Sequence, residues 1–211
     1  MIKNLLTILY DRGSFGKALS FSFIAGLLTI FTVIYLPKSN HPGIWGVANF
    51  LGSPGNDVFL IATNGLILVW AWRKQLRSIM VLTLWLDFMV WLMVQGMKVL
   101  AVGSWSLRPN GSPGGFPSGH ATHAFGMAFL LTLFFPRFAW IWYSCAAAIS
   151  WSRVETDFHS GVQVTAGIIL GLGIGCILVS KWYGHIEAAG FKLISRDHSL
   201  VQPTHRPYAA E

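Results

Sequence analysis

Two short segments of this sequence combine residue types that can do chemistry on an anion. The first, "PSGH", runs from Pro117 to His120, and the second, "SRVETDFH", runs from Ser152 to His159. Each segment ends on a histidine, and an imidazole can act as acid, base or nucleophile near neutral pH. Gly119 lets the backbone approach a ligand closely, because no side chain stands in the way. We therefore expect acid–base and nucleophilic chemistry where these segments meet.

Basic residues accompany both segments. Arg153 lies within the second segment, Arg108 precedes Pro109 in the loop before the first, and Lys98 ends the apolar run before that loop. Guanidinium groups form paired hydrogen bonds with phosphate oxygens, and a lysine adds a point charge. Ser118 stands where a helix cap would be, so the N–H groups of a helix N-terminus would face the anion. This set of residues suits a phosphoryl group.

The composition indicates the elements that must position these residues. Of the 211 residues, 54% are hydrophobic and 11% are charged, whereas roughly 25% are charged in an ordinary soluble domain. Six apolar runs account for the excess: Ala18–Leu36, Val58–Trp72, Ser78–Gln95, Ser118–Phe135, Phe138–Trp151 and Val162–Ser180. The first and last are about long enough to cross a ~30 Å hydrocarbon core. The sequence predicts an all-α, polytopic membrane protein with a bundle of six transmembrane helices.

The net charge of +7 follows the predicted topology. With six spans, one side of the membrane holds both termini and eleven of the fifteen basic residues: Lys3, Arg12, Lys17, Arg73, Lys74, Arg77, Arg137, Lys181, Lys192, Arg196 and Arg206. Cytoplasmic loops carry an excess of Lys and Arg. We therefore expect both termini in the cytoplasm, most simply at a bacterial inner membrane, and no nucleic-acid partner.

The chain is expected to form a single membrane-embedded domain over residues 1–211. Residues 1–17 are expected to lie along the membrane surface, and residues 184–211 to form a cytoplasmic tail with a short helix. On the external side, segments 37–57, 99–117 and 152–161 are expected as loops. Since the fourth and fifth helices form a hairpin, the last two of these loops emerge on one face. Two arginines, a lysine and two histidines can then converge there. The sequence has no convincing spacing of metal ligands, so the cations would replace a metal and no cofactor is expected.

These motifs resemble those of the type-2 phosphatidic acid phosphatase superfamily of membrane lipid phosphatases, which read K-x6-RP, PSGH and SR-x5-H-x3-D. The resemblance runs from Lys98 to Gln163, and the six-helix layout extends it over most of the chain. It implies that His159 attacks phosphorus to form a phosphohistidine, while His120 protonates the leaving oxygen. It also implies a phosphate-binding set made of Lys98, Arg108, Ser118, Gly119 and Arg153. Water would then hydrolyse the phosphoenzyme.

The sequence departs from the family pattern at two positions. Nine residues separate Lys98 from Arg108 where the family has six, and Gln163 stands where the family has aspartate. If the last helix begins near His159, positions 159 and 163 share a face, so the Gln163 carbonyl could accept a ring proton of His159. A glutamine cannot supply the negative charge that stabilises an imidazolium. The glucose-6-phosphatase branch is similar in carrying glutamine here.

Several other polar or small residues lie in the predicted spans. We expect His123 to serve packing, and Asp87 to be neutral or bonded to Asn64 or to a serine of a neighbouring helix, because a carboxylate in a membrane span needs a partner. Gly167, Gly171 and Gly175 form a small-residue face for close helix packing. This face could contact another helix of the chain or a second protomer in a homo-oligomer.

The sequence as a whole predicts a metal-independent phosphatase that acts on an amphiphilic phosphate or pyrophosphate lipid in the external leaflet. Candidate substrates are undecaprenyl pyrophosphate, phosphatidic acid, phosphatidylglycerophosphate and lipid A phosphates. The small size and short loops favour the isoprenoid pyrophosphate. Two alternatives stay open: a lipid phosphotransferase with the same intermediate, and an inactive transporter or scaffold of the same fold.

Overall fold

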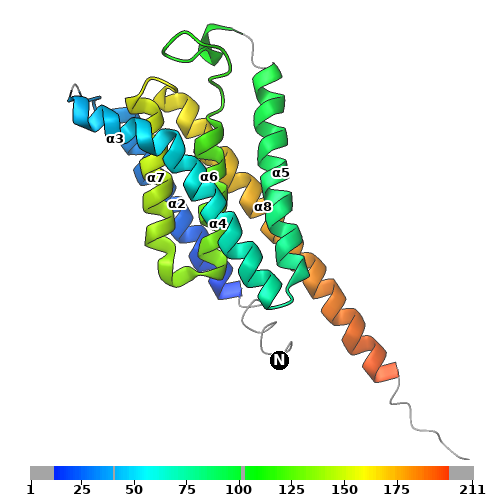
Figure 1. Cartoon of the computed structure of the whole chain (residues 1–211). Coiled ribbons are helices and arrows are strands. Elements are labelled where there is room, and N and C mark those ends of the chain that lie inside the picture. The colour runs from blue at the N-terminus through cyan, green and yellow to red at the C-terminus, as the bar shows by residue number, and fades with distance from the viewer. Residues whose placement is uncertain (1–11, 40, 101–102, 200–211) are drawn as a thin grey trace, which may run out of the picture.

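A computed structural model of the protein describes residues 12–39, 41–100 and 103–199, and this part of the chain is helical (Figure 1). The α-helices are α2 (Arg12–Tyr35), α3 (Pro42–Gly52), α4 (Pro54–Arg73), α5 (Arg77–Leu100), α6 (Gly119–Phe134), α7 (Ala139–Glu155) and α8 (Gly161–Ser199). Two short 3-10 helices span Ser104–Ser106 and Pro136–Phe138. The predicted all-α class is confirmed.

Helix α6 is the centre of the bundle, and helices α2, α4, α5, α7 and α8 all contact it. Its side chains from Ala124 to Leu133 are all buried, including Phe125 and Phe129. A helix that is apolar all round must be covered on every side. The first turn of α6, which carries the "PSGH" motif, is therefore the start of the most buried helix of the bundle.

Helices α6 and α8 approach each other so closely that only glycine fits at their contact. A Cβ added at Gly167 would lie 2.5 Å from the carbonyl oxygen of Ser118, and one added at Gly171 would overlap the carbonyl group of Thr122. A Cβ at Gly175 would lie 3.0 Å from the Phe129 ring. The small-residue face thus packs against α6 of the same chain. Of the two expected partners of this face, the structure shows the other helix of the same chain, and a homo-oligomer stays a prediction.

Within the part of the chain that the structure describes, three helices are long and apolar enough to cross a membrane: Phe15–Tyr35, Arg77–Leu100 and Gly161–His185. Their outer faces carry exposed large apolar side chains, such as Phe31 at 65% exposure and Ile169 at 61%. Helices α6 and α7 have 16 and 17 residues, which at 1.5 Å per residue gives about 24 to 26 Å, less than the ~30 Å hydrocarbon core. All six apolar runs form helices, and the number of six crossings stays a prediction.

Two segments differ from the sequence expectation. Residues 42–52, expected within a loop, form helix α3, which begins with Pro42 at its first position and is capped by His41, whose ring accepts a hydrogen bond from the Gly43 N–H at 3.1 Å. Proline is favoured at this position because the first helical N–H has no partner. Past residue 184, helix α8 continues without a break to Ser199 and extends beyond the bundle (Figure 1). Of the expected N-terminal surface segment, residues 1–11 lie outside the described residues, and the rest begins α2.

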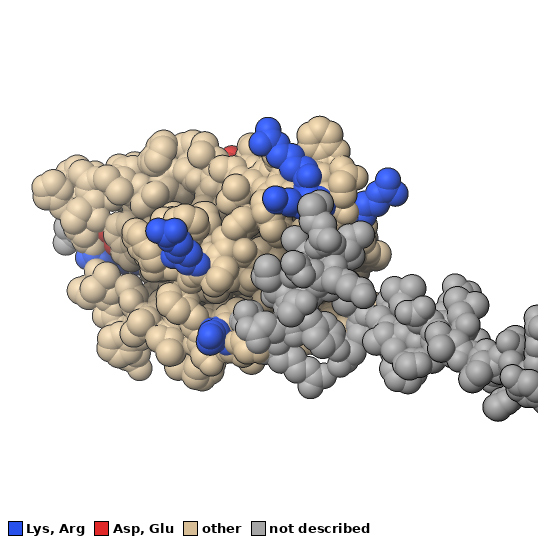
Figure 2. Space-filling model, turned by 90° about the horizontal axis from the view of Figure 1, so that it is seen from below, with Lys and Arg blue, Asp and Glu red and all other residues tan. Residues whose placement is uncertain are grey.

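The chemical motifs lie at one end of the bundle with Lys98, Arg108 and Arg153, whereas most other basic residues of the described chain lie at the opposite end. Lys98 is in the last turn of α5, Gly119 begins α6 and Arg153 is in the last turn of α7. At the other end, α4 finishes at Arg73 and α5 begins at Arg77, and Figure 2 shows basic side chains spread over that face. The predicted topology requires this arrangement, because it places the motifs and most of the basic residues on opposite sides of the membrane.

Candidate active site

His159 lies in the turn between α7 and α8, outside the spanning helices, and is 2% exposed. Its Nδ1 is 2.7 Å from the carbonyl oxygen of Gly115. A carbonyl oxygen can only accept a hydrogen bond, so Nδ1 carries the proton and Nε2 keeps its lone pair. The His159 backbone N–H donates to the Arg153 carbonyl at 2.9 Å, which holds the turn in place. The imidazole is thus held in the tautomer that a nucleophile at Nε2 requires.

The surroundings of His159 keep its ring uncharged. Burial lowers the pKa of His159 to about 3, and the positive charges of Arg153 and Arg108 act in the same direction, against the hydrogen bond to Gly115. A positive charge on His120 lowers the pKa of His159 further. The Nε2 lone pair is therefore available at neutral pH.

Gln163 holds the loop before α6 instead of bonding to His159. The residue is 2% exposed, and its amide nitrogen donates to the carbonyl oxygens of Leu107 at 2.7 Å and Trp105 at 3.2 Å. The expected partner of the His159 ring is thus corrected: a backbone carbonyl 44 residues earlier in the chain takes that role. Gly115 itself packs against the amide, because a Cβ added there would lie 2.7 Å from the Gln163 nitrogen.

Two guanidinium groups lie beside Phe158, the residue before His159. The Arg153 guanidinium is 4.4 Å from the ring centroid and that of Arg108 is 5.9 Å from it, within the range of cation–π contacts. Arg153 is 5% exposed and donates to the Gly52 carbonyl. The Nε atoms of both arginines are buried without a hydrogen-bond partner among the described residues. The two arginines therefore bring unused donors close to the nucleophile.

Ser118 is the N-cap residue of α6, as the motif suggested, but its side chain does not cap the helix. The hydroxyl is fully buried and has no hydrogen-bond partner within the described chain. The Ser118 N–H donates to the Gln163 carbonyl at 3.0 Å, which ties the motif to α8. Beyond it, the first N–H groups of α6, beginning with Gly119, have no partner inside the helix. This helix start thus offers a buried hydroxyl and backbone donors to an anion.

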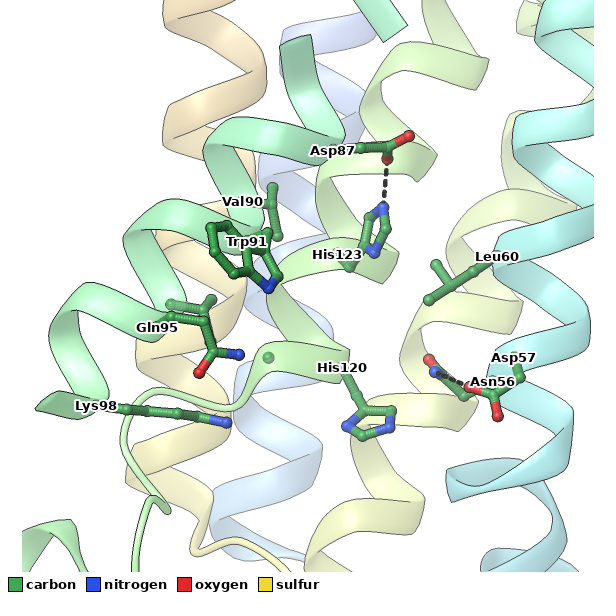
Figure 3. A pocket seen from close by; sticks show the side chains of 12 residues that line it. Asn56, Asp57, Leu60, Asp87, Val90, Trp91, Gln95, Lys98, His120 and His123 are labelled. Carbon is green, nitrogen blue, oxygen red and sulfur yellow. Dashed lines mark hydrogen bonds and ion pairs between the residues drawn. The ribbon is translucent and has the colours of Figure 1, made fainter. Parts of the chain in front are cut away.

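His120 and Gly119 line a cavity of about 540 Å³ between α4, α5 and α6 (Figure 3). Lys98 lines the same cavity, and its stem passes 3.8 Å from where a Gly114 Cβ would be. The ammonium group of Lys98 interacts electrostatically with Arg108 and Arg153. The longer spacing between Lys98 and Arg108 therefore still brings the lysine to the site.

Three residues of this cavity had not been assigned to the site. His123, expected to serve packing, lies 2.6 Å from the Asp87 carboxylate, which also accepts a hydrogen bond from the Asn64 amide at 3.4 Å, as expected. Asp57, at the start of α4, faces His120 across the cavity (Figure 3). Two signals pointed to the pair of Asp87 and His123: a carboxylate in an apolar helix requires a partner, and His123 is one turn from His120. Asp57 had no such signal. In the residues that the structure describes, no group of three or more His, Cys, Asp or Glu could hold a metal ion.

Two comparisons with known proteins found relatives of this chain, and the first gives the residues that match. The sequence profile of the PAP2 superfamily matches residues 103–186, a range that contains every site residue named above from α6, α7, α8 and the loop carrying Arg108. The chain is also similar to a bacitracin transport permease protein, BcrC, of Bacillus licheniformis, with 37% identity over 57 residues. That alignment covers 27% of this chain and 28% of the relative. No solved structure matches the chain.

Proposed function

We propose that this chain, whose residues 103–186 match the PAP2 superfamily, is a lipid phosphate or pyrophosphate phosphatase that works without a metal. The orientation of His159 is the observation that carries this proposal. Its Nδ1 proton is held by the Gly115 carbonyl, so the Nε2 lone pair is ready to attack, with two guanidinium groups beside it. A histidine that served only to stabilise the fold would not require two arginines whose buried Nε atoms have no hydrogen-bond partner among the described residues.

In the first step, Nε2 of His159 attacks phosphorus, a P–N bond forms and the P–O bond to the leaving group breaks. The negative charge of the bound phosphate stabilises the protonated form of His120, which then donates its proton to the leaving oxygen. Arg153, Arg108 and the helix start at Gly119 hold the phosphoryl oxygens, where negative charge must be stabilised in the transition state. In the second step, His120 accepts a proton from water, the water oxygen attacks phosphorus, and the P–N bond breaks. Gln163 acts as a positioning residue, through the loop that carries Gly115.

The substrate proposed for this site is an amphiphile. The site lies at one end of the bundle, beside helices whose outer faces are apolar, so a lipid can present its headgroup from the membrane. Undecaprenyl pyrophosphate, phospholipid phosphates and lipid A phosphates all fit this description. The distribution of basic residues supports a site on the external, periplasmic face of a bacterial inner membrane, with both termini in the cytoplasm.

Two other functions share part of this evidence. A phosphotransferase would use the same phosphohistidine and pass the phosphoryl group to a second lipid. A transporter or scaffold is the other alternative, since the relative from Bacillus licheniformis is named a transport permease protein. The buried cations and the fixed tautomer of His159 favour the catalytic functions over transport.

The test is phosphate release by the purified full chain from a panel of lipid phosphates, with and without EDTA. We expect release in both conditions, and a loss of at least about 1,000-fold in His159→Ala, the order of effect seen when a nucleophile is removed. His185→Ala is the matched control, because His185 is exposed on α8 far from the motifs. Release that persists in His159→Ala would refute the phosphohistidine, and a phosphorylated lipid acceptor in place of free phosphate would indicate the transferase.

A further inference from the structure

The cavity between α4, α5 and α6 lies on one side of the two catalytic histidines. His120, Gly119 and Lys98 line it, whereas His159 borders a second cavity of about 340 Å³ together with Ser160 and Gly161. In phosphoryl transfer the attacking and leaving groups lie roughly in line on opposite faces of phosphorus. With His159 as the nucleophile and His120 as the acid, the group bonded to the phosphate must therefore occupy the cavity on the His120 side.

The walls of this cavity carry hydrogen-bond acceptors to which a hydrocarbon chain could not donate. Asn56 and Asp57 face His120 from α4, and Gln95 lines the α5 wall (Figure 3). Asn56 is only 2% exposed, its amide nitrogen donates to Asp57 at 3.4 Å, and its side-chain oxygen has no hydrogen-bond partner among the described residues. An unsatisfied buried oxygen costs free energy unless a ligand donates to it.

The polar lining also continues deep into α5. Asp87 lies about 16 Å along the helix axis from Lys98, at 1.5 Å per residue. Its carboxylate forms a hydrogen bond of 2.6 Å with the ring of His123 on α6. Both residues line the cavity. An ionisable residue inside a membrane helix faces the bundle interior and marks a path for polar ligands. A bare hydrocarbon chain in this space could add no hydrogen bond to the one that Asp87 and His123 make with each other.

We propose that this cavity binds the leaving group of the reaction, and that its lining selects a leaving group with free hydroxyl groups, such as glycerol or a sugar. Asp57 and the Asn56 oxygen accept hydrogen bonds from hydroxyls next to the scissile oxygen. The proposal rests on the proposed function, because the assignment of His159 and His120 determines which side the leaving group occupies. It favours polyol phosphates over the isoprenoid pyrophosphate that the size of the chain suggested.

The experiment compares two pairs of substrates that differ in free hydroxyls beside the scissile oxygen. In the lipid pair, phosphatidylglycerophosphate has such a hydroxyl, and phosphatidic acid has only acylated ones. In the soluble pair, glycerol 3-phosphate has them and propyl phosphate does not. We expect kcat/KM to be about 10- to 100-fold higher for the hydroxyl-bearing member of at least one pair, the effect of one hydrogen bond to a charged group. The pair that shows it identifies whether the polyol belongs to a lipid or to a soluble ester.

Asp57→Asn tests the assignment of the wall. We expect it to lower the preference for the hydroxyl-bearing member by about tenfold, because an amide accepts more weakly than a carboxylate. Asp157→Asn is the matched control, since Asp157 lies at the same end of the bundle, outside the cavity lining, and pairs with Lys38. In Asp157→Asn, the ratio of kcat/KM between the two members of each substrate pair should equal that of the wild type.

The possible failures are distinguishable. Equal kcat/KM within both pairs, or a preference that Asp57→Asn leaves unchanged, would overturn the leaving-group proposal while the phosphatase function stands. No phosphate release from any of the four compounds or from the lipid panel, by folded protein, would overturn both proposals.

Discussion

Gly115→Ala tests whether the nucleophile is positioned through Gln163. The added Cβ would lie 2.7 Å from the side-chain nitrogen of Gln163, 2.8 Å from its oxygen and 2.9 Å from its Cδ. Normal contacts are about 3.5 to 4.0 Å, so the two groups must separate by roughly 1 Å. Either the Gln163 amide leaves its two carbonyl partners, at about 1 kcal/mol each, or the Gly115 carbonyl moves away from His159.

Both movements misplace Nε2 of His159, while the arginines that hold the phosphate keep their contacts with Phe158. A displacement of about 1 Å at a reacting group can lower the rate by roughly 100-fold. We therefore expect kcat for phosphate release to fall by about 100-fold, with a small change in KM. Steady-state kinetics on the substrate of the wild type measures both parameters.

Two controls separate this effect from general damage. Gly173→Ala adds a Cβ on α8 that meets no atom within 4 Å, so it should retain wild-type kinetics. In the Gln163→Ala background the clash is absent, so Gly115→Ala should cost much less than it does alone, as a double-mutant cycle would report. Wild-type kcat in Gly115→Ala, or costs that simply multiply in the double mutant, would refute the positioning role.

Three further predictions concern charge and packing. The folded protein holds the pKa of His159 at about 3, whereas an unfolded chain has the ordinary histidine value of about 6.5. Between pH 3 and about pH 6.5 the unfolded chain therefore binds more protons than the folded one. The Tm should fall as the pH drops through this window, and the slope should be shallower in His159→Asn. Arg153→Lys should lower kcat/KM by about 100- to 1,000-fold, because a lysine cannot form the paired hydrogen bonds of a guanidinium, while Arg137→Lys at the opposite end should keep wild-type kinetics. Gly171→Ala should lower the free energy of unfolding by about 1 to 3 kcal/mol. Its Tm should therefore be lower than that of the control variant Gly173→Ala, and equal Tm values would contradict the close contact of α6 and α8.

Much of the architecture could be predicted from local features of the chain. The apolar runs predicted helices that the structure has, and the order of "PSGH" and "SRVETDFH" predicted the superfamily that the comparison found over residues 103–186. The helical segment 42–52 was missed, because Gly, Pro and Asn in a short stretch indicate a loop when no contact with α7 is known. The extension of α8 past residue 184 was missed for a similar reason, since polar composition alone does not end a helix.

The roles of Gly115 and Gln163 needed the folded chain. Helical spacing placed Gln163 on the face of His159, yet the ring bonds to a loop carbonyl, and the glutamine holds that loop through Leu107 and Trp105. Every backbone carbonyl has the same chemistry, so no residue type marks the one that will reach the ring. The same holds for Asp57, which gains its place opposite His120 only because α4 packs beside α6.

By itself, the sequence determined the chemical groups of this protein and the helices that carry them, because residue type and apolar periodicity act over one or two helical turns. Only the tertiary structure decided which nitrogen of His159 is free, what holds the loop before α6, and which polar side chains share a cavity with His120. Those relations join residues tens of positions apart, and they arise from how closely α4, α5, α6 and α8 pack.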